Sequence, residues 1–150
     1  MPAHQNVYPW VAASSTFLAA TLIACGTPPP DLDVRLKRMS ERYRFMVEME
    51  APATGPSIGK IHSWTLRLAT PDGSPVSHAH IAITGGMPQH GHGLPTQPRV
   101  TAEPLPGTYV IDGMKFSMTG WWNLGLDIDA AGVQDRAVFN VVLDDAGLRR

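Results

Sequence analysis

From Tyr43 onward, apolar and polar residues alternate with a period of two in most of the segments that lie between glycines and prolines. Successive side chains of a β-strand point to opposite faces, so this period is typical of strands with one buried face. The clearest runs have apolar residues at positions 43, 45, 47 and 49, at 64, 66 and 68, at 79, 81 and 83, at 122, 124, 126 and 128, and at 137, 139, 141 and 143. No long segment has a helical period, and the pattern therefore predicts an all-β fold.

Turn-forming residues separate these runs at short intervals. Pro71-Asp72-Gly73 and Ala131-Gly132 are turn signals, and further short strands are expected at 99–103, 108–112 and 114–118. Seven or eight short strands without a long helix are typical of an immunoglobulin-like antiparallel β-sandwich. We therefore assign residues 43–147 to one β-sandwich domain, which is long enough to bury a core of its own.

The N-terminal part of the chain has a different character. Val11–Ala24 is an apolar run that is too short to span a bilayer, which needs roughly 20 residues, but it suits the hydrophobic region of a signal peptide. Leu22–Gly26 resembles a bacterial lipobox, in which cleavage precedes the cysteine and its sulfur is lipidated. We expect residues 1–24 to be a lipoprotein signal peptide, Cys25 to be lipidated, and residues 25–42 to form a solvated tether. The alternative is an apolar N-terminus with an incidental cysteine, because the usual Lys or Arg before the apolar run is missing.

The lipoprotein interpretation predicts a location in the bacterial cell envelope. The protein would be anchored to a lipid bilayer through Cys25, with its domain in the periplasm or another extracytoplasmic space. Cys25 is the only cysteine, which excludes an intrachain disulfide and a zinc site of several thiolates. The chain has 12 basic and 13 acidic residues, so its charge gives no reason to expect a nucleic-acid partner.

Residues 85–98, GGMPQHGHGLPTQP, place one thioether and two imidazoles in a segment that glycine and proline keep out of helix and strand. Alternate residues of an extended segment share a face, so His90 and His92 can lie on one side of the chain, with Met87 three residues before them. Sulfur and imidazole without a thiolate favour copper over magnesium, calcium or manganese. The alternative is a glycine-rich loop with solvated histidines and no ligand.

A second thioether source is GMKFSMTGWW at residues 113–122. Met118 stands where this strand is expected to end, so its sulfur could lie at the rim of the sandwich, whereas Met114 is expected in the core. His78 and His80 fall on the polar face of the strand that leads into the loop. They form either a secondary metal site or a solvated surface.

The pairing of GGMPQHGHGLPT with a later GMKFSMTGWW resembles the YtkA-like/FixH-like family of small bacterial envelope proteins, some of which are labelled auxin-binding proteins. The resemblance covers roughly residues 73–143 and implies an immunoglobulin-like sandwich, membrane tethering and an association with copper handling or oxidase assembly. Residue by residue, it points to four metal ligands: Met87, His90, His92 and Met118. FixH has a membrane helix whereas this chain is expected to be lipid-anchored, so a role in oxidase assembly does not follow.

We therefore expect a membrane-anchored lipoprotein whose β-sandwich binds Cu(I) or Cu(II) for delivery or sequestration, with a copper donor or acceptor protein as a partner. Imidazole binds metal when neutral, so copper affinity should fall below about pH 6.5. The alternative is a small-ligand-binding or protein-interaction domain with a structural loop, although only Arg99 and Lys115 are near in sequence to meet a carboxylate. We do not expect an enzyme, because no Asp or Glu lies between Gly73 and Pro98 and no nucleophile-elbow, phosphate-binding or metalloprotease motif is present.

Overall fold

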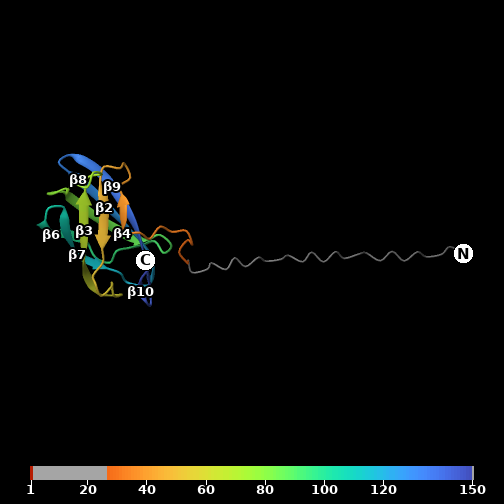
Figure 1. Cartoon of the computed structure of the whole chain (residues 1–150). Coiled ribbons are helices and arrows are strands. Elements are labelled where there is room, and N and C mark those ends of the chain that lie inside the picture. The colour runs from red at the N-terminus through yellow and green to blue at the C-terminus, as the bar shows by residue number, and fades with distance from the viewer. Residues whose placement is uncertain (2–26, 150) are drawn as a thin grey trace.

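The structure is a computed structural model that describes residue 1 and residues 27–149. The predicted signal peptide and Cys25 lie outside the described residues. Within them the protein is all β, as predicted, and has ten strands (Figure 1). No helix in this part of the chain is long and apolar enough to cross a membrane. The strands are β1 (Lys37–Met39), β2 (Met46–Glu50), β3 (Ile61–Ala69), β4 (His80–Met87), β5 (His92–Gly93), β6 (Arg99–Leu105), β7 (Thr108–Lys115), β8 (Gly120–Ala130), β9 (Val133–Asp144) and β10 (Gly147–Leu148).

All ten strands belong to one antiparallel sheet that curls around its own core (Figure 1). The strand order is β1-β2-β3-β7-β6-β4-β8-β9-β10, with β5 beside β4. Strands β4 and β6 share a single pair, Ala82 with Arg99, so the sheet folds over between them and its two halves enclose one core. The predicted antiparallel sandwich is confirmed.

The core consists of the apolar residues of the alternating runs. Those that the structure buries are Phe45, Val47, Met49, Trp64, Leu66, Leu68, Ile81, Trp122, Leu124, Leu126, Ile128, Ala137, Phe139, Val141 and Leu143. Tyr43 departs from the prediction, since it is 72% exposed and has a φ of 59°. The chain turns at residues 41–44 before β2 begins, so the strand alternation does not reach Tyr43.

Residues 33–42 lie in the predicted tether, yet they are folded against the sheet. Three contacts cover the outer edge of β9: the Glu41 amide donates to the Arg136 carbonyl at 2.8 Å, the Arg38 guanidinium donates to the Val138 carbonyl, and the Asn140 side chain donates to the Asp33 carbonyl at 2.9 Å. An open strand edge would expose unpaired backbone groups, and these contacts take the place of a neighbouring strand. The sequence pattern did not indicate this packing, because β1 is only three residues long and the residues that this segment contacts lie about a hundred positions later in the chain.

A buried carboxylate holds the turn that precedes β2. Asp135 of β9 is 8% exposed and accepts hydrogen bonds from the Ser40 hydroxyl at 2.6 Å and from the amides of Arg42 and Arg44 at 3.1 and 3.2 Å. Burial by itself raises the pKa of Asp135, but these hydrogen bonds and one from the next amide outweigh it, so the pKa lies below its ordinary value. The charged form therefore stabilises the fold.

Candidate functional site

The segment predicted as an irregular loop is a β-hairpin. Strand β4 runs through Gly85 and Gly86 to Met87, and β5 returns alongside it, pairing Met87 with His92. The amides of His90 and Gly91 donate to the Met87 carbonyl at 3.1 and 3.0 Å and close the turn. The prediction of an irregular segment was therefore wrong for the residues in β4 and β5, because pairing of the two strands overrides the weak strand preference of glycine.

The imidazoles of His90 and His92 lie side by side on this hairpin. Their ring centroids are 6.2 Å apart and their planes differ by 14°, and both side chains are exposed. They share one side of the hairpin as predicted, but the cause differs: Gly91 has a φ of 64°, so the chain between them is turned rather than extended. The hairpin thus presents two nitrogen donors to solvent.

The thioether of Met87 lies in the core and is 2% exposed. Met87 falls on the inward face of β4 together with Ile81, since the two are six residues apart in one strand. A methyl group added at Gly120 would lie 2.8 Å from Met87 Cε, so the end of this side chain packs against the start of β8. A metal ion at the exposed imidazoles would reach the Met87 sulfur only if the side chain left the core.

Met118 lies on the connection between β7 and β8 and is 41% exposed. Its carbonyl oxygen accepts a hydrogen bond at 3.1 Å from Nε1 of Trp122, which is fully buried. Met118 stands two residues before Gly120, against which the end of the Met87 side chain packs. Met118 is the more accessible of the two thioethers.

Three aromatic rings support this connection from inside the core. Trp64 and Phe116 pack edge to face at a centroid distance of 6.1 Å, and Phe116 and Trp122 do so at 5.3 Å. The neighbouring Trp121 has its indole on the outer face of β8, where it donates to Asn140 at 3.0 Å. Trp122 therefore packs beneath the candidate site in the core, whereas Trp121 lies on the outer surface of the sheet.

The structure gives His78 and His80 different neighbours. Strand β4 begins at His80 and His78 has a φ of 57°, so the polar strand face that they were predicted to share is absent. The His78 amide donates to the Glu103 carboxylate at 2.9 Å, and its ring nitrogen lies 3.8 Å from the same group. His80 instead pairs across the sheet with Asp129. The turn before β4 breaks the alternation on which the prediction depended.

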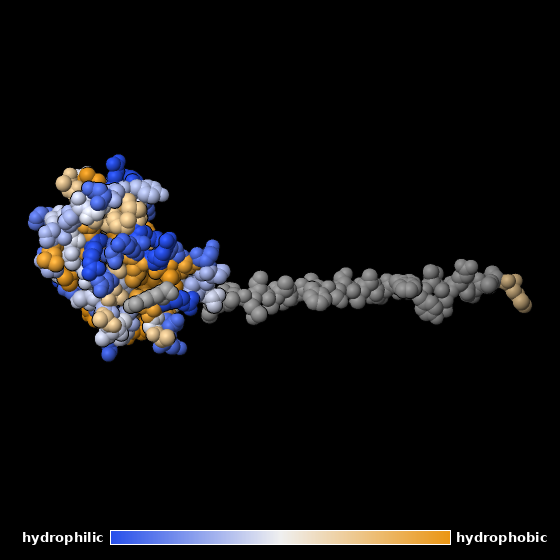
Figure 2. All heavy atoms as spheres, viewed as in Figure 1, coloured by the Kyte–Doolittle hydropathy of each residue, from blue (hydrophilic) through white to orange (hydrophobic). Residues whose placement is uncertain are grey.

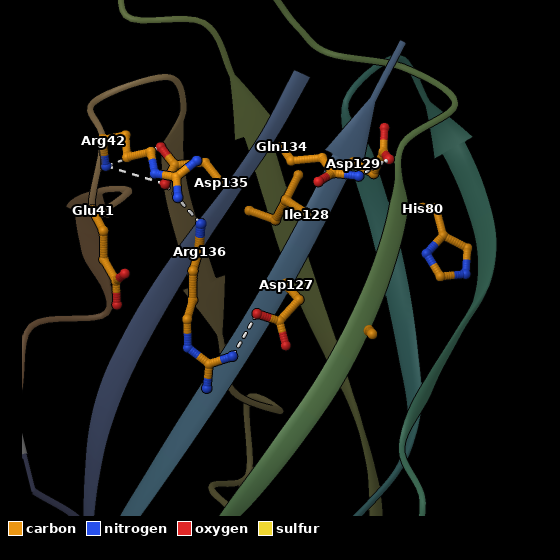
Figure 3. A pocket seen from close by; sticks show the side chains of 10 residues that line it. Glu41, Arg42, His80, Asp127, Ile128, Asp129, Gln134, Asp135 and Arg136 are labelled. Carbon is orange, nitrogen blue, oxygen red and sulfur yellow. Dashed lines mark hydrogen bonds and ion pairs between the residues drawn. The ribbon is translucent and has the colours of Figure 1, made fainter. Parts of the chain in front are cut away.

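His80 lines a groove of about 500 Å³ together with residues of β8, β9 and the 41–42 turn. Figure 3 shows the side chains that line this groove. Two carboxylates of β8 in this groove already have partners, because Asp127 binds the Arg136 guanidinium and Asp129 accepts from the Gln134 amide at 2.8 Å. The His80 ring stands apart from them (Figure 3). Within residues 27–149, no three His, Cys, Asp or Glu side chains are placed to hold one metal ion.

Replacing Gly86 by alanine should distort the imidazole hairpin. The added Cβ would overlap the His92 carbonyl oxygen, a backbone atom that can move only if β5 shifts away from β4. We expect a loss of about 1–3 kcal/mol in the free energy of unfolding, measured by denaturant titration, and changed ring signals of the two histidines in NMR spectra. Gly93→Ala is the matched control, because its Cβ would make only an ordinary contact at 3.8 Å. Equal behaviour of the two variants would contradict this packing argument.

The fold and the hairpin define a class of protein: a small antiparallel β-sandwich that carries a solvent-facing pair of imidazoles at one end. The YtkA-like family model matches residues 37–127, and the chain belongs to this family, as its motifs predicted. Among solved structures, the ZirS C-terminal domain is similar at 18% sequence identity, covering 93% of this chain and 86% of that chain with a TM-score of 0.41. None of the curated proteins matches the chain. The family match begins at the first residue of β1 and includes the hairpin and Met118.

Proposed function

We propose that this protein is a copper-binding protein of the bacterial envelope, in which His90 and His92 provide imidazole ligands and Met118 provides a thioether. The paired rings, 6.2 Å apart on a fixed hairpin, are the observation that carries the proposal. A cation between the rings would be within reach of a nitrogen from each after small side-chain rotations. Imidazole and thioether donors suit copper better than the hard divalent cations.

The exposure of these donors suits copper transfer rather than permanent storage. Both imidazoles are open to solvent and Met118 is partly exposed, so a ligand of a donor or acceptor protein could enter the coordination sphere. Metal sites that exchange ligands keep such an open position, whereas structural sites are closed by protein ligands. Met87 is a further thioether donor that could join if its side chain left the core.

Membrane anchoring through Cys25 is part of the proposal, and a contact of nearby Thr27 with the hairpin supports it. The side chain of Gln89, in the hairpin turn, donates to the Thr27 carbonyl at 3.0 Å. A lipid on Cys25, two residues before Thr27, would therefore hold the imidazole pair close to the bilayer surface. We propose a copper donor or acceptor in the same membrane as the partner, and no catalytic role for this site.

The test is an anaerobic titration with Cu(I) against a competing chelator, using a soluble form that begins at Gly26. This form retains every core residue, since the core lies between Leu36 and Leu148. We expect stoichiometric binding that is lost in His90→Ala/His92→Ala and weakened about tenfold in Met118→Ala. His78→Ala is the matched histidine control and should bind like the unmodified protein, because His78 contacts Glu103 instead. Copper retained in the double histidine variant would overturn the proposal, and parallel titrations with Cu(II) and Zn(II) define the metal preference.

A second candidate is a small-ligand or protein-interaction site, and a shallow hollow beside the hairpin favours it. The hollow measures about 400 Å³ and is lined by Met87, Pro88, His92, Asn123 and neighbouring glycines. Neither Arg99 nor Lys115 lines it, so it offers no cation for an organic acid. Ligand binding that persisted without His90 and His92 would favour this candidate over copper.

A further inference from the structure

A different hollow, of about 480 Å³, lies where the curled sheet does not close. Strands β1 and β10 are the two ends of the strand order, and the hollow is bordered by the segment just before β1, by the end of β2 with the residues after it, and by the end of β10. Its apolar lining consists of Val34, Leu36, Met49, Ala51, Ala53 and Leu148. Figure 2 shows hydrophobic atoms exposed among hydrophilic ones on the face of the domain that it presents.

The apolar surface of this hollow is continuous with the core. Met49 is 2% exposed, and Leu36, Ala51 and Leu148 pack against the core cluster as partly buried residues. Volumes of 300–1,000 Å³ with mainly apolar walls and a few polar groups are typical of small-molecule sites. The hollow therefore has the size and lining of a site for an apolar ligand.

The charged groups at its mouth favour an anionic ligand. Asp33 accepts two hydrogen bonds from the Arg35 side chain at 2.9 Å and one from Arg38 at 2.6 Å, so one carboxylate faces two guanidinium groups. The Arg35 guanidinium holds the pKa of Asp33 well below its usual range, which keeps this carboxylate charged but leaves positive charge in excess. Arg149, also at the mouth, is 3.8 Å from Asp144 and largely exposed.

The remaining charged side chain that lines the hollow, Glu50, is already neutralised by an ion pair. Glu50 forms an ion pair with Arg67 at 3.0 Å. Its carboxylate therefore opposes an incoming anion less than a free carboxylate would. Arg35 and Arg149 are the cationic side chains that line the hollow, and each lies beside a carboxylate, Asp33 and Asp144 respectively. Both guanidinium groups are more than half exposed, so a ligand head group can reach them from solvent.

We infer that this hollow binds a long-chain carboxylate, with its alkyl chain on the apolar lining and its head group at Arg35 and Arg149. Burial of the CH₂ groups of the chain favours binding, and a charge-assisted hydrogen bond to guanidinium fixes the orientation. This inference does not depend on copper, because none of the proposed metal ligands lines the hollow.

The experiment is an isothermal titration of the form beginning at Gly26 with dodecanoate, below its micelle concentration. Ala53→Phe places a ring in the hollow from an exposed position and should abolish binding, whereas Ala102→Phe, at an exposed alanine of β6, should not. Arg35→Gln/Arg149→Gln should weaken binding about tenfold or more, and Arg99→Gln should leave it unchanged. Dodecyltrimethylammonium has the same chain with a cationic head and should bind at least tenfold more weakly than dodecanoate.

Three results would overturn the inference. They are the absence of saturable heat with dodecanoate, binding of dodecanoate to Ala53→Phe that is as strong as to the unmodified protein, and binding of dodecanoate that is no stronger than that of the ammonium amphiphile. Size-exclusion chromatography is run beside the titration, since a dimer that Ala53→Phe dissociates would show that a second copy of the chain covers the hollow instead. None of these outcomes affects the copper titration, so the two proposals fail separately.

Discussion

Replacing Trp122 by alanine should lower the free energy of unfolding by about 3–5 kcal/mol, the largest effect expected of any single change considered for this protein. The side chain is fully buried and packs edge to face against Phe116 at a centroid distance of 5.3 Å. Alanine would leave a cavity in a core that the surrounding strands cannot collapse to fill, and it would also remove the indole donor to the Met118 carbonyl. Denaturant titration followed by far-ultraviolet circular dichroism measures the loss.

Trp121→Ala is the matched control, since it removes the same side chain one residue earlier. Its indole lies on the outer face of β8 and makes one hydrogen bond to Asn140, so we expect a loss of only about 1 kcal/mol. Trp122→Phe separates the contribution of packing from that of the hydrogen bond, because phenylalanine keeps a ring in the core but cannot donate to the Met118 carbonyl. Equal losses in the two alanine variants would mean that the sandwich core is not arranged as described.

Replacing Asp135 by asparagine should cost about 1–3 kcal/mol at neutral pH, because the donors from Ser40, Arg42 and Arg44 would lose a charged acceptor in a buried position. The cost should depend on pH in a defined direction. The pKa of Asp135 is lowered in the folded protein, so its stabilising effect is complete above the unfolded value of about 3.9 and is lost as the pH falls through the folded value. The stability gap between the two proteins should be constant from pH 5 to 8 and shrink below about pH 4.

Asp129→Asn is the control for this prediction. Asp129 also accepts hydrogen bonds, from the Gly132 amide at 3.1 Å and the Gln134 side chain at 2.8 Å, but it is partly exposed at the end of β8. Water can replace its lost contacts, so we expect a cost below about 1 kcal/mol. A gap between the Asp135→Asn variant and the unmodified protein that persisted unchanged at pH 3 would show that the carboxylate is not the stabilising form.

The strands that could be predicted are those with both a buried and an exposed face. The runs through Trp64 and Trp122 alternate with a period of two, as does most of the run through Phe139, and each is one strand with its apolar side in the core. The family resemblance was also accessible from the sequence, because the two motifs that carry it are short and contiguous. The proximity of His90 and His92 could be expected too, since two residues separated by one glycine have few ways to lie apart.

The parts that could not be predicted depend on contacts between distant segments. The contacts of residues 33–42 with β9 join positions about a hundred residues apart, and nothing local marks them. Met87 continues the inward-facing positions of Ile81 and Ile83 in β4. The glycines and the proline beside Met87 made this continuation hard to see in the sequence, because these residues are rare in strands. The separation of His78 from His80 results from one residue with positive φ, which local sequence does not specify unless the residue is glycine.

The sequence by itself determined the all-β class, the approximate strands, the family and the pairing of two imidazoles on one short segment, because these follow from side-chain periodicity and local chain geometry. Only the tertiary structure decided that Met87 is in the core and Met118 at the surface, that Asp135 is buried and hydrogen-bonded, and that an apolar hollow remains between the segment before β1 and β10. Burial and charge environment are properties of all neighbours in space, and most of those neighbours are far away along the chain.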